Sequence, residues 1–177
     1  MSGVPGRDYI GIGVGGIILG SDGRVLLAQR GPKARNQPGQ WENPGGALKF
    51  GERFEDAIVR EIREELSIEV VVEGLLRVVN HVLPEDGQHW VSPTLVCRYV
   101  SGTPTIREHE KCSGVEWFSL DHLPKPMTAI SRTDLVCYRQ LAEEGGRLLA
   151  VEWCSPIMEN AGEFGGQQRS RRMVQGP

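Results

Sequence analysis

The hydrophobic residues between Phe54 and Leu66 recur at helical spacing. At about 100° per residue they fall on one face of a helix. That face is formed by Phe54, Ile58, Val59, Ile62 and Leu66. Glu55 and Asp56 stand in the first turn, where the positive end of the helix dipole favours acidic side chains. The pattern predicts a helix over residues 54–66 with one buried side.

A β-rich segment at residues 9–19 is followed by the turn residues Asp22-Gly23 and by a second apolar segment at residues 25–30. An Asp-Gly pair between two such segments predicts a β-hairpin. Because a turn and a strand follow the first segment, it does not have the helix that a dinucleotide-binding G-x-G-x-x-G fingerprint requires. We interpret its glycines as places where the backbone passes close to a neighbouring strand or a ligand. The glycines that fit the fingerprint are Gly11, Gly13 and Gly16.

Two further apolar segments, at residues 69–81 and 89–100, flank a turn at residues 84–87 and predict a second hairpin. We expect the first of these strands to be broken near Glu73-Gly74. Proline cannot donate a hydrogen bond to a sheet, so we expect Pro93 to lie at a bulge or at a sheet edge.

The rest of the chain predicts one short strand and one further helix. A polar loop at residues 101–112 precedes a strand over residues 114–118. A helix over about residues 128–144 follows, and Gly145-Gly146 ends it. Residues 147–154 are expected to form a short strand or to dock on the core. The helix residues expected to pack on the sheet are Leu135, Val136, Tyr138, Leu141 and Ala142.

A chain of 177 residues with 39% hydrophobic and 24% charged residues favours a single globular domain. We divide it into a short flexible lead at residues 1–8, a domain at residues 9–158 and a flexible tail at residues 159–177. The net charge of −3 argues against a surface for nucleic-acid polymers. No apolar run approaches the length of a membrane span, and we expect a cytoplasmic protein. Four scattered cysteines predict reduced thiols and no zinc site: Cys97, Cys112, Cys137 and Cys154.

Three glutamates gather beside the apolar face of the predicted helix: Glu61, Glu64 and Glu65. Like charges three or four residues apart destabilise a helix by roughly 0.2–0.5 kcal/mol per pair. A solvated acidic face is the simplest interpretation, but it does not account for the glycine turn and the loop before the helix. A glycine turn, a loop and clustered carboxylates together indicate a site for a hard divalent cation such as Mg²⁺.

The same stretch resembles the Nudix box, the signature of the MutT-type hydrolases. Gly46 is followed after five residues by Glu52, and after seven more by Arg60-Glu61-Ile62-Arg63-Glu64-Glu65-Leu66-Ser67-Ile68. The chain departs from the pattern at Ser67, where the family usually has the glycine that ends the helix. The resemblance extends more weakly over residues 9–124. It implies an α/β fold in which a mixed β-sheet is sandwiched between helices.

The resemblance also implies hydrolysis of a nucleoside diphosphate linked to another group, with Mg²⁺ or Mn²⁺ as the cofactor. It assigns metal binding to the Gly45 carbonyl and to the carboxylates of Glu61, Glu64 and Glu65. Glu64 would act as a ligand or as the base. Arg60 would hold the glutamates in place by charge-assisted hydrogen bonds.

Other site residues are implied outside the box. In some relatives a loop glutamate before the late strand contributes a metal ligand or the base, and here Glu110 is the nearest match and Glu108 the second. Arg30, at a strand end, resembles basic residues that often contact the substrate in Nudix enzymes. Trp90 can either pack within the fold or stack on a nucleobase, an interaction worth roughly 1–3 kcal/mol.

Three functions are consistent with the resemblance. The first is hydrolysis of a nucleoside triphosphate, natural or modified, to a nucleoside monophosphate and pyrophosphate. The second is cleavage of ADP-ribose or of a nucleotide sugar, which is indicated by Pro84, sixteen residues after Ile68. The third is a non-catalytic nucleotide-sensing domain, which the retained glutamates disfavour. Small members of the family are often homodimers, and the resemblance allows a homodimer here.

Overall fold

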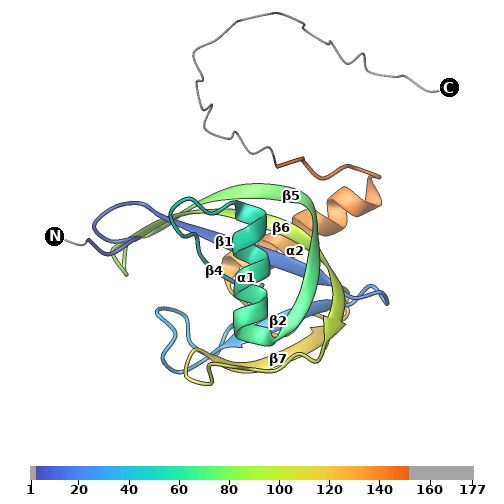
Figure 1. The fold of residues 1–177 in the computed structure, drawn as a ribbon, viewed down its shortest axis with the longest axis horizontal. Helices are drawn as coiled ribbons and strands as arrows, with labels where there is room; N and C mark the ends of the chain where they lie inside the picture. The colour runs from blue at the N-terminus through green and yellow to red at the C-terminus, as the bar shows by residue number, and fades with distance from the viewer. Residues whose placement is uncertain (1–2, 152–177) are drawn as a thin grey trace, which may run out of the picture.

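A computed structural model describes residues 3–151 of the chain. One seven-stranded sheet lies in the middle of this region, with α1 in front of it and α2 behind it (Figure 1). The predicted tail at residues 159–177 and Cys154 lie outside the described residues. No helix in the described region is long and apolar enough to cross a membrane. The elements are β1 (Gly11–Leu19), β2 (Val25–Arg30), β3 (Trp41–Glu42), β4 (Gly45–Ala47), α1 (Phe54–Leu66), β5 (Ile68–Leu83), β6 (Gln88–Gly102), β7 (Cys112–Phe118) and α2 (Ala129–Glu143).

The sheet is mixed, with the strand order β3-β2-β1-β6-β5. β6 runs parallel to β1, with Gly11 opposite Trp90. The other edge of β1 is shared by two antiparallel partners. The first half of β1 pairs with β4, and its last residues pair with β2 as the predicted hairpin. β7 pairs with β2 on its other side. The segment that leads into α1 is therefore fixed directly against the central strand.

Neighbouring residues of β1 point to opposite faces of the sheet, and one helix covers each face. Ile18 packs with Ile58 and Ile62 of α1, whereas Ile17 packs with Leu135 of α2. All five side chains are fully buried. Burial of side chains of this size contributes roughly 1.5–3 kcal/mol each. The predicted apolar face of α1 is thus its buried face, and the prediction of a sheet between helices is confirmed.

β5 is one continuous strand, although the sequence predicted a break near Glu73-Gly74. Its pairing with β6 shifts register just before Gly74, which marks a β-bulge. A Cβ on Gly74 would overlap the side chain of Leu148. Leu149 exchanges two backbone hydrogen bonds of 2.9 Å with Leu75. The segment after α2 therefore docks on the sheet beside the bulge.

Pro93 lies in β6, which is an interior strand of the sheet, so of the two expected positions, a bulge or a sheet edge, the edge was wrong. It pairs with Val78 of β5. On the β1 side, the matched positions of β6 step from Val91 to Thr94, and Pro93 falls between them. Pro93 thus lies where the pairing of β6 with β1 is interrupted.

α2 begins after Thr128, whose hydroxyl accepts a hydrogen bond from the Ser131 amide. Leu135 is fully buried, as predicted. Val136 is 48% exposed, so the prediction that it packs on the sheet was wrong. It stands one residue past the buried stripe, and the buried neighbour of Leu135 is instead Asp134.

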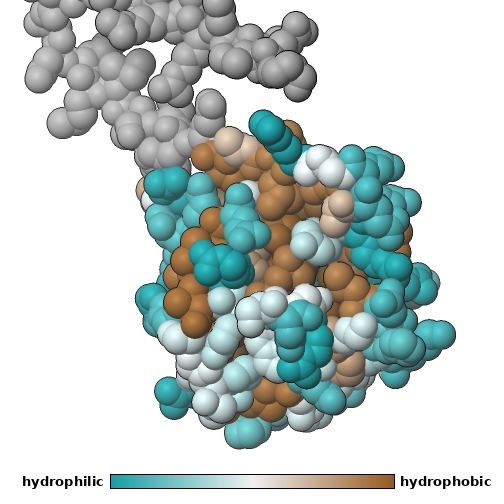
Figure 2. All heavy atoms as spheres, turned by 90° about the vertical axis from the view of Figure 1, so that its right-hand side faces the viewer, coloured by the Kyte–Doolittle hydropathy of each residue, from teal (hydrophilic) through white to brown (hydrophobic). Residues whose placement is uncertain are grey.

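β5 forms one edge of the sheet and leaves apolar side chains at the surface. Val71, Val78 and Val82 are all about half exposed. Figure 2 shows one face of the molecule on which hydrophobic (brown) residues gather between hydrophilic (teal) ones. Such a surface is compatible with the homodimer that the sequence resemblance allows, and the homodimer stays a prediction.

Candidate active site

Two glycines of β4 bring the sheet into direct contact with the acidic side of α1. Gly46 pairs with Val14 of β1, and the carboxylate of Glu61 lies against it, so that a Cβ on Gly46 would overlap that carboxylate. A Cβ on Gly45 would overlap the Val14 carbonyl oxygen. The Glu61 side chain is consequently only 14% exposed. The glycine turn and the acidic edge of α1 therefore meet, and only glycine leaves room for Glu61.

Arg60 joins the carboxylates of this region into one network. Its guanidinium donates to both carboxylate oxygens of Glu52, at 2.6 and 2.9 Å. It also donates to Glu61 at 2.7 Å and to Glu64 at 3.2 Å. The hydrogen bonds from Arg60 hold the pKa of Glu52 at about 2, because they favour the ionised carboxylate. Arg60 therefore has the contacts to Glu61 and Glu64 that the resemblance implied, and a bidentate contact to Glu52 in addition.

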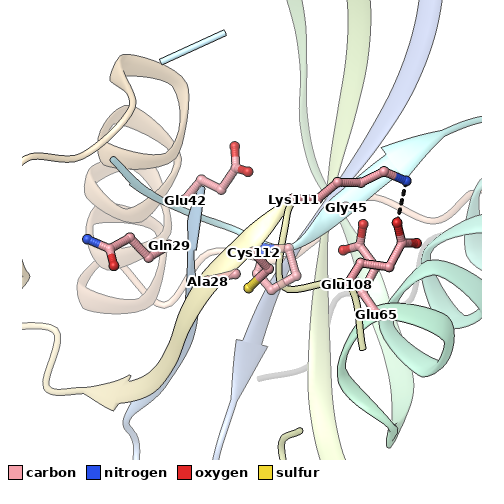
Figure 3. A pocket seen from close by; sticks show the side chains of 9 residues that line it. Ala28, Gln29, Glu42, Gly45, Glu65, Glu108, Lys111 and Cys112 are labelled. Carbon is pink, nitrogen blue, oxygen red and sulfur yellow. Dashed lines mark ion pairs between the residues drawn. The ribbon is translucent and has the colours of Figure 1, made fainter. Parts of the chain in front are cut away.

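Glu65 faces a hollow between α1, β2, β3 and the loop before β7. Figure 3 shows Glu65 beside Glu108, with Lys111 reaching to Glu108 and Glu42 projecting on the far side. The pKa of Glu65 is raised to about 8, first because the group is buried and then because the charges of Glu61, Glu42 and Glu108 oppose its ionisation. The hollow therefore carries an excess of carboxylates over cations.

This excess fits a divalent cation in charge and in ligand type. Mg²⁺ and Mn²⁺ prefer oxygen ligands, which the carboxylates of Glu61, Glu64 and Glu65 and the Gly45 carbonyl can supply. A cation placed there would reverse the effect that raises the pKa of Glu65. Within residues 3–151, no three acidic, histidine or cysteine side chains already converge on one point.

The loop before β7 presents Glu108 to the hollow, in place of the first choice from the sequence, Glu110. Glu110 forms an ion pair of 2.5 Å with Lys33 at the surface, and its side chain is 70% exposed. Glu108 lines the hollow and forms an ion pair of 2.6 Å with Lys111. Glu108 therefore lies at the hollow and Glu110 does not, and the role of either as a metal ligand or base stays a prediction.

Arg30 binds Glu42, one of the residues that line the hollow. Its guanidinium donates to both carboxylate oxygens of Glu42, at 2.6 and 2.7 Å. Two further hydrogen bonds of 2.7 Å reach the backbone and side-chain oxygens of Asn36. With these partners Arg30 holds the Glu42 carboxylate in place, and its direct contact with a substrate stays a prediction.

Trp90 packs against the beginning of the chain. Its ring lies so close to Gly6 and Gly11 that a Cβ on either glycine would overlap it. The Arg35 guanidinium stands over the ring at 5.4 Å from its centroid, and the indole N–H donates to Gln88 at 3.0 Å. Gly11 is therefore a close-approach glycine, as the sequence interpretation expected. Stacking of Trp90 on a nucleobase stays a prediction.

A buried polar cluster behind the site was not found from the sequence. Asp134 of α2 is 2% exposed at its side chain and accepts hydrogen bonds from Arg77 at 2.6 Å, from Thr94 at 3.0 Å and from Asn43 at 3.3 Å. Burial raises the pKa of Asp134, and the Arg77 guanidinium opposes that effect. The backbone N–H of Asn43 donates to the Ser131 hydroxyl at 2.8 Å.

This cluster fixes the segment that enters the glycine turn. Asn43 directly precedes Pro44, whose carbonyl accepts a hydrogen bond of 2.8 Å from the Gly16 amide of β1. α2 therefore holds the approach to Gly45 from the opposite face of the sheet. A signal was present in the sequence, because Ser131 and Asp134 share the helix face of Leu135.

Comparisons with known proteins agree with this geometry. A family model described as the NUDIX domain matches residues 10–138. An ADP-ribose pyrophosphatase of Methanocaldococcus jannaschii is 32% identical over 110 residues, which are 61% of this chain and 62% of the relative. A CTP pyrophosphohydrolase of Escherichia coli is 49% identical over 55 residues, which are 31% of this chain and 40% of the relative. The chain thus spans less than two thirds of the length of these two curated relatives.

A solved structure extends the likeness to the whole fold. The crystal structure of a MutT NUDIX hydrolase from Burkholderia pseudomallei matches with a TM-score of 0.67 and 38% sequence identity. The match covers 73% of this chain and 98% of that chain.

Proposed function

The chain belongs to the NUDIX domain family, and from this premise we propose that it hydrolyses the pyrophosphate linkage of a nucleoside triphosphate, natural or modified. The products would be a nucleoside monophosphate and pyrophosphate. The observation that carries the proposal is the meeting of the glycine turn with the carboxylates of α1. Only a glycine at position 46 leaves room for the Glu61 carboxylate, and Arg60 donates hydrogen bonds to both Glu61 and Glu64.

Each residue of this site has a distinct task in the proposed reaction. When bound, Mg²⁺ or Mn²⁺ would neutralise phosphate oxygens and lower the pKa of a water molecule from 15.7 towards about 7. Glu61, Glu65 and the Gly45 carbonyl would hold the ion. Arg60 keeps one oxygen of Glu61 in a hydrogen bond of 2.7 Å, which fixes the direction of the other oxygen.

Glu64 is the exposed member of the three glutamates and is available to a water molecule. Its side chain is 55% exposed, and it is held by Arg60 at 3.2 Å and by Lys49 at 4.0 Å. A carboxylate in this position can act as a ligand or take the proton of the attacking water, which typically accelerates a reaction by about 10²–10⁴-fold. Glu108, across the hollow, is a second candidate for the same task.

ADP-ribose or a nucleotide sugar is the second candidate substrate. The relative from Methanocaldococcus jannaschii is named an ADP-ribose pyrophosphatase. Pro84 supports the same choice by its spacing, but it lies in the β5–β6 turn, where its carbonyl accepts a hydrogen bond of 3.1 Å from the Gly87 amide. A structural role in that turn accounts for Pro84, so we place the nucleoside triphosphate first.

A substrate panel tests the proposal. Purified protein is incubated with each nucleoside triphosphate, ADP-ribose and nucleotide sugars, with Mg²⁺, with Mn²⁺ and with a chelator, and the phosphate products are quantified. We expect metal-dependent release of pyrophosphate from a nucleoside triphosphate. A clear preference for ADP-ribose would overturn the first choice of substrate.

Variants separate catalysis from nucleotide sensing. Glu64→Gln and Glu65→Gln should lose turnover while the fold is retained. Glu143→Gln makes the same chemical change on an exposed position of α2 and should keep full activity. If the wild-type protein binds nucleotides with no turnover of any substrate, the non-catalytic sensing function replaces the enzyme. Cytoplasmic location stays a prediction from the sequence.

A further inference from the structure

α1 ends at a residue whose backbone is unusual for a side chain with a Cβ. Ser67 follows Leu66 with φ of 58° and ψ of 33°, which is the left-handed region. Among the described residues, only Gln37 shares a positive φ without being glycine. Left-handed geometry favours glycine, so a serine here calls for a compensating contact.

The Ser67 side chain makes such a contact with the loop that carries Glu108. Its hydroxyl oxygen accepts a hydrogen bond of 2.5 Å from Nε of Arg107. The Arg107 amide donates to the Glu65 carbonyl at 3.1 Å, and the Thr105 amide donates to the Leu66 carbonyl at 2.9 Å. The loop therefore caps the last carbonyls of α1 through its backbone and is fastened to Ser67 through Arg107.

Arg107 is followed directly by Glu108, which faces Glu65 in the hollow. The Glu108 carbonyl accepts hydrogen bonds of 2.9 Å from the amides of Lys111 and Cys112. At its far end the loop is attached to the segment after β2, where the Gly31 amide donates to the Lys111 carbonyl at 2.6 Å. Glu108 is thus held between the contacts at the end of α1 and the contact of Lys111 with Gly31.

We propose that Ser67 and Arg107 are positioning residues for nucleotide hydrolysis, and that they act by holding Glu108 beside Glu65. The inference rests on the proposed function of the site. Neither residue touches the substrate in this account. Loss of the contact between Ser67 and Arg107 would displace the Glu108 carboxylate relative to Glu65. A displacement of about 1 Å in an active site can lower a rate by about 100-fold.

A purely structural role for the contact gives different expectations. If Arg107 only completes the end of α1, its loss lowers stability and leaves the turnover of the folded protein unchanged. Ser67→Gly separates the two roles, because glycine adopts the left-handed backbone readily and removes the acceptor. Ser67→Asn is its matched partner, since asparagine tolerates the same backbone and offers a side-chain oxygen to Arg107.

The experiment measures kcat, KM, the Mg²⁺ dependence and the unfolding temperature of Ser67→Gly, Ser67→Asn and Arg107→Ala. We expect kcat to fall about tenfold or more in Ser67→Gly and Arg107→Ala, with a smaller change in KM, and to be retained in Ser67→Asn. Arg63→Ala is the control, because it removes an exposed arginine from the same helix end, where it pairs with Glu69 and not with the loop. It should keep the wild-type kcat.

A double-mutant cycle with Glu108→Gln tests the route of the effect. If Ser67 acts through Glu108, Ser67→Gly should lower kcat in the wild-type background and add nothing in the Glu108→Gln background. Amide hydrogen exchange of metal-free protein gives a second readout. The Arg107 amide, bonded to the Glu65 carbonyl, should exchange faster in Ser67→Gly and at the wild-type rate in Ser67→Asn.

Wild-type turnover in Ser67→Gly and Arg107→Ala would overturn the inference while leaving the proposed function intact. Equal losses of kcat on Ser67→Gly in both backgrounds would also overturn it. Absence of turnover in the wild-type protein with every nucleotide tested would instead overturn the proposed function, and the exchange measurement would then report only the loop contact.

Discussion

Replacing Glu65 by glutamine should make the metal-free protein more stable while removing its response to Mg²⁺. The pKa of Glu65 is about 8 in the folded protein against an ordinary value of 4.5, because the group is buried among other carboxylates. A folded-state pKa above the unfolded one means that stability is complete below about pH 4.5 and is lost as the pH rises towards 8.

The magnitude follows from this shift. One pKa unit corresponds to about 1.36 kcal/mol, so about three units between the ordinary value and pH 7.5 give about 4 kcal/mol at most. Glu65 retains some contact with solvent, and screening reduces the expected gain for Glu65→Gln to about 2 kcal/mol. For a protein of this size, such a gain raises the unfolding temperature by about 4–8 °C.

Urea denaturation in the presence of a chelator measures the effect at about pH 4.5 and at about pH 7.5. The variant and the wild-type protein should be equally stable at the lower pH, and the variant more stable at the higher pH. Added Mg²⁺ should stabilise the wild-type protein and not the variant. Glu143→Gln, on the exposed side of α2, should change neither result. If Glu65→Gln were no more stable than wild type at the higher pH, the crowding of carboxylates around Glu65 would not exist as described.

Three further outcomes are expected. Gly46→Ala should displace the Glu61 carboxylate and lower kcat by about 10-fold or more, with an unchanged circular dichroism spectrum, because its Cβ would occupy the space of that carboxylate. Asp134→Ala should lower the free energy of unfolding in urea by about 3 kcal/mol, since it leaves the partly buried Arg77 without its partner. Glu52→Gln should make the free energy of unfolding less dependent on pH between about 4.5 and 2. The Arg60 contact holds the Glu52 pKa at about 2, so the stabilisation by ionised Glu52 is present above about pH 4.5 and is lost as the pH falls towards 2. Urea denaturation at several pH values over that range would measure the difference.

Features set by short stretches of chain could be predicted from the sequence. The helix from Phe54 to Leu66 has the predicted bounds, because its apolar spacing and its acidic first turn are both local signals. The hairpin around Asp22-Gly23 follows from a local turn preference in the same way. The family resemblance predicted a mixed sheet between helices. The packing of Ile18 against α1 and of Ile17 against α2 confirms this arrangement.

Features that depend on contacts between distant segments could not be predicted. Asp134 is buried because Arg77, Thr94 and Asn43 reach it from three other parts of the chain. Glu108 reaches the hollow, and Glu110 does not, because hydrogen bonds to the end of α1 set the path of the loop. A residue count gives the length of such a loop and no information about its direction.

The parallel pairing of β1 with β6 has a consequence for how the protein is made. During synthesis on the ribosome, the glycine turn and α1 emerge well before β6 and β7. β1 pairs with β6, with Gly11 opposite Trp90, and β2 pairs with β7, with Leu27 opposite Glu116. Pairings between such distant segments form late in folding. The acidic edge of α1 therefore leaves the exit tunnel together with Gly46 and Glu52, but before Glu108 and the later strands that complete the hollow.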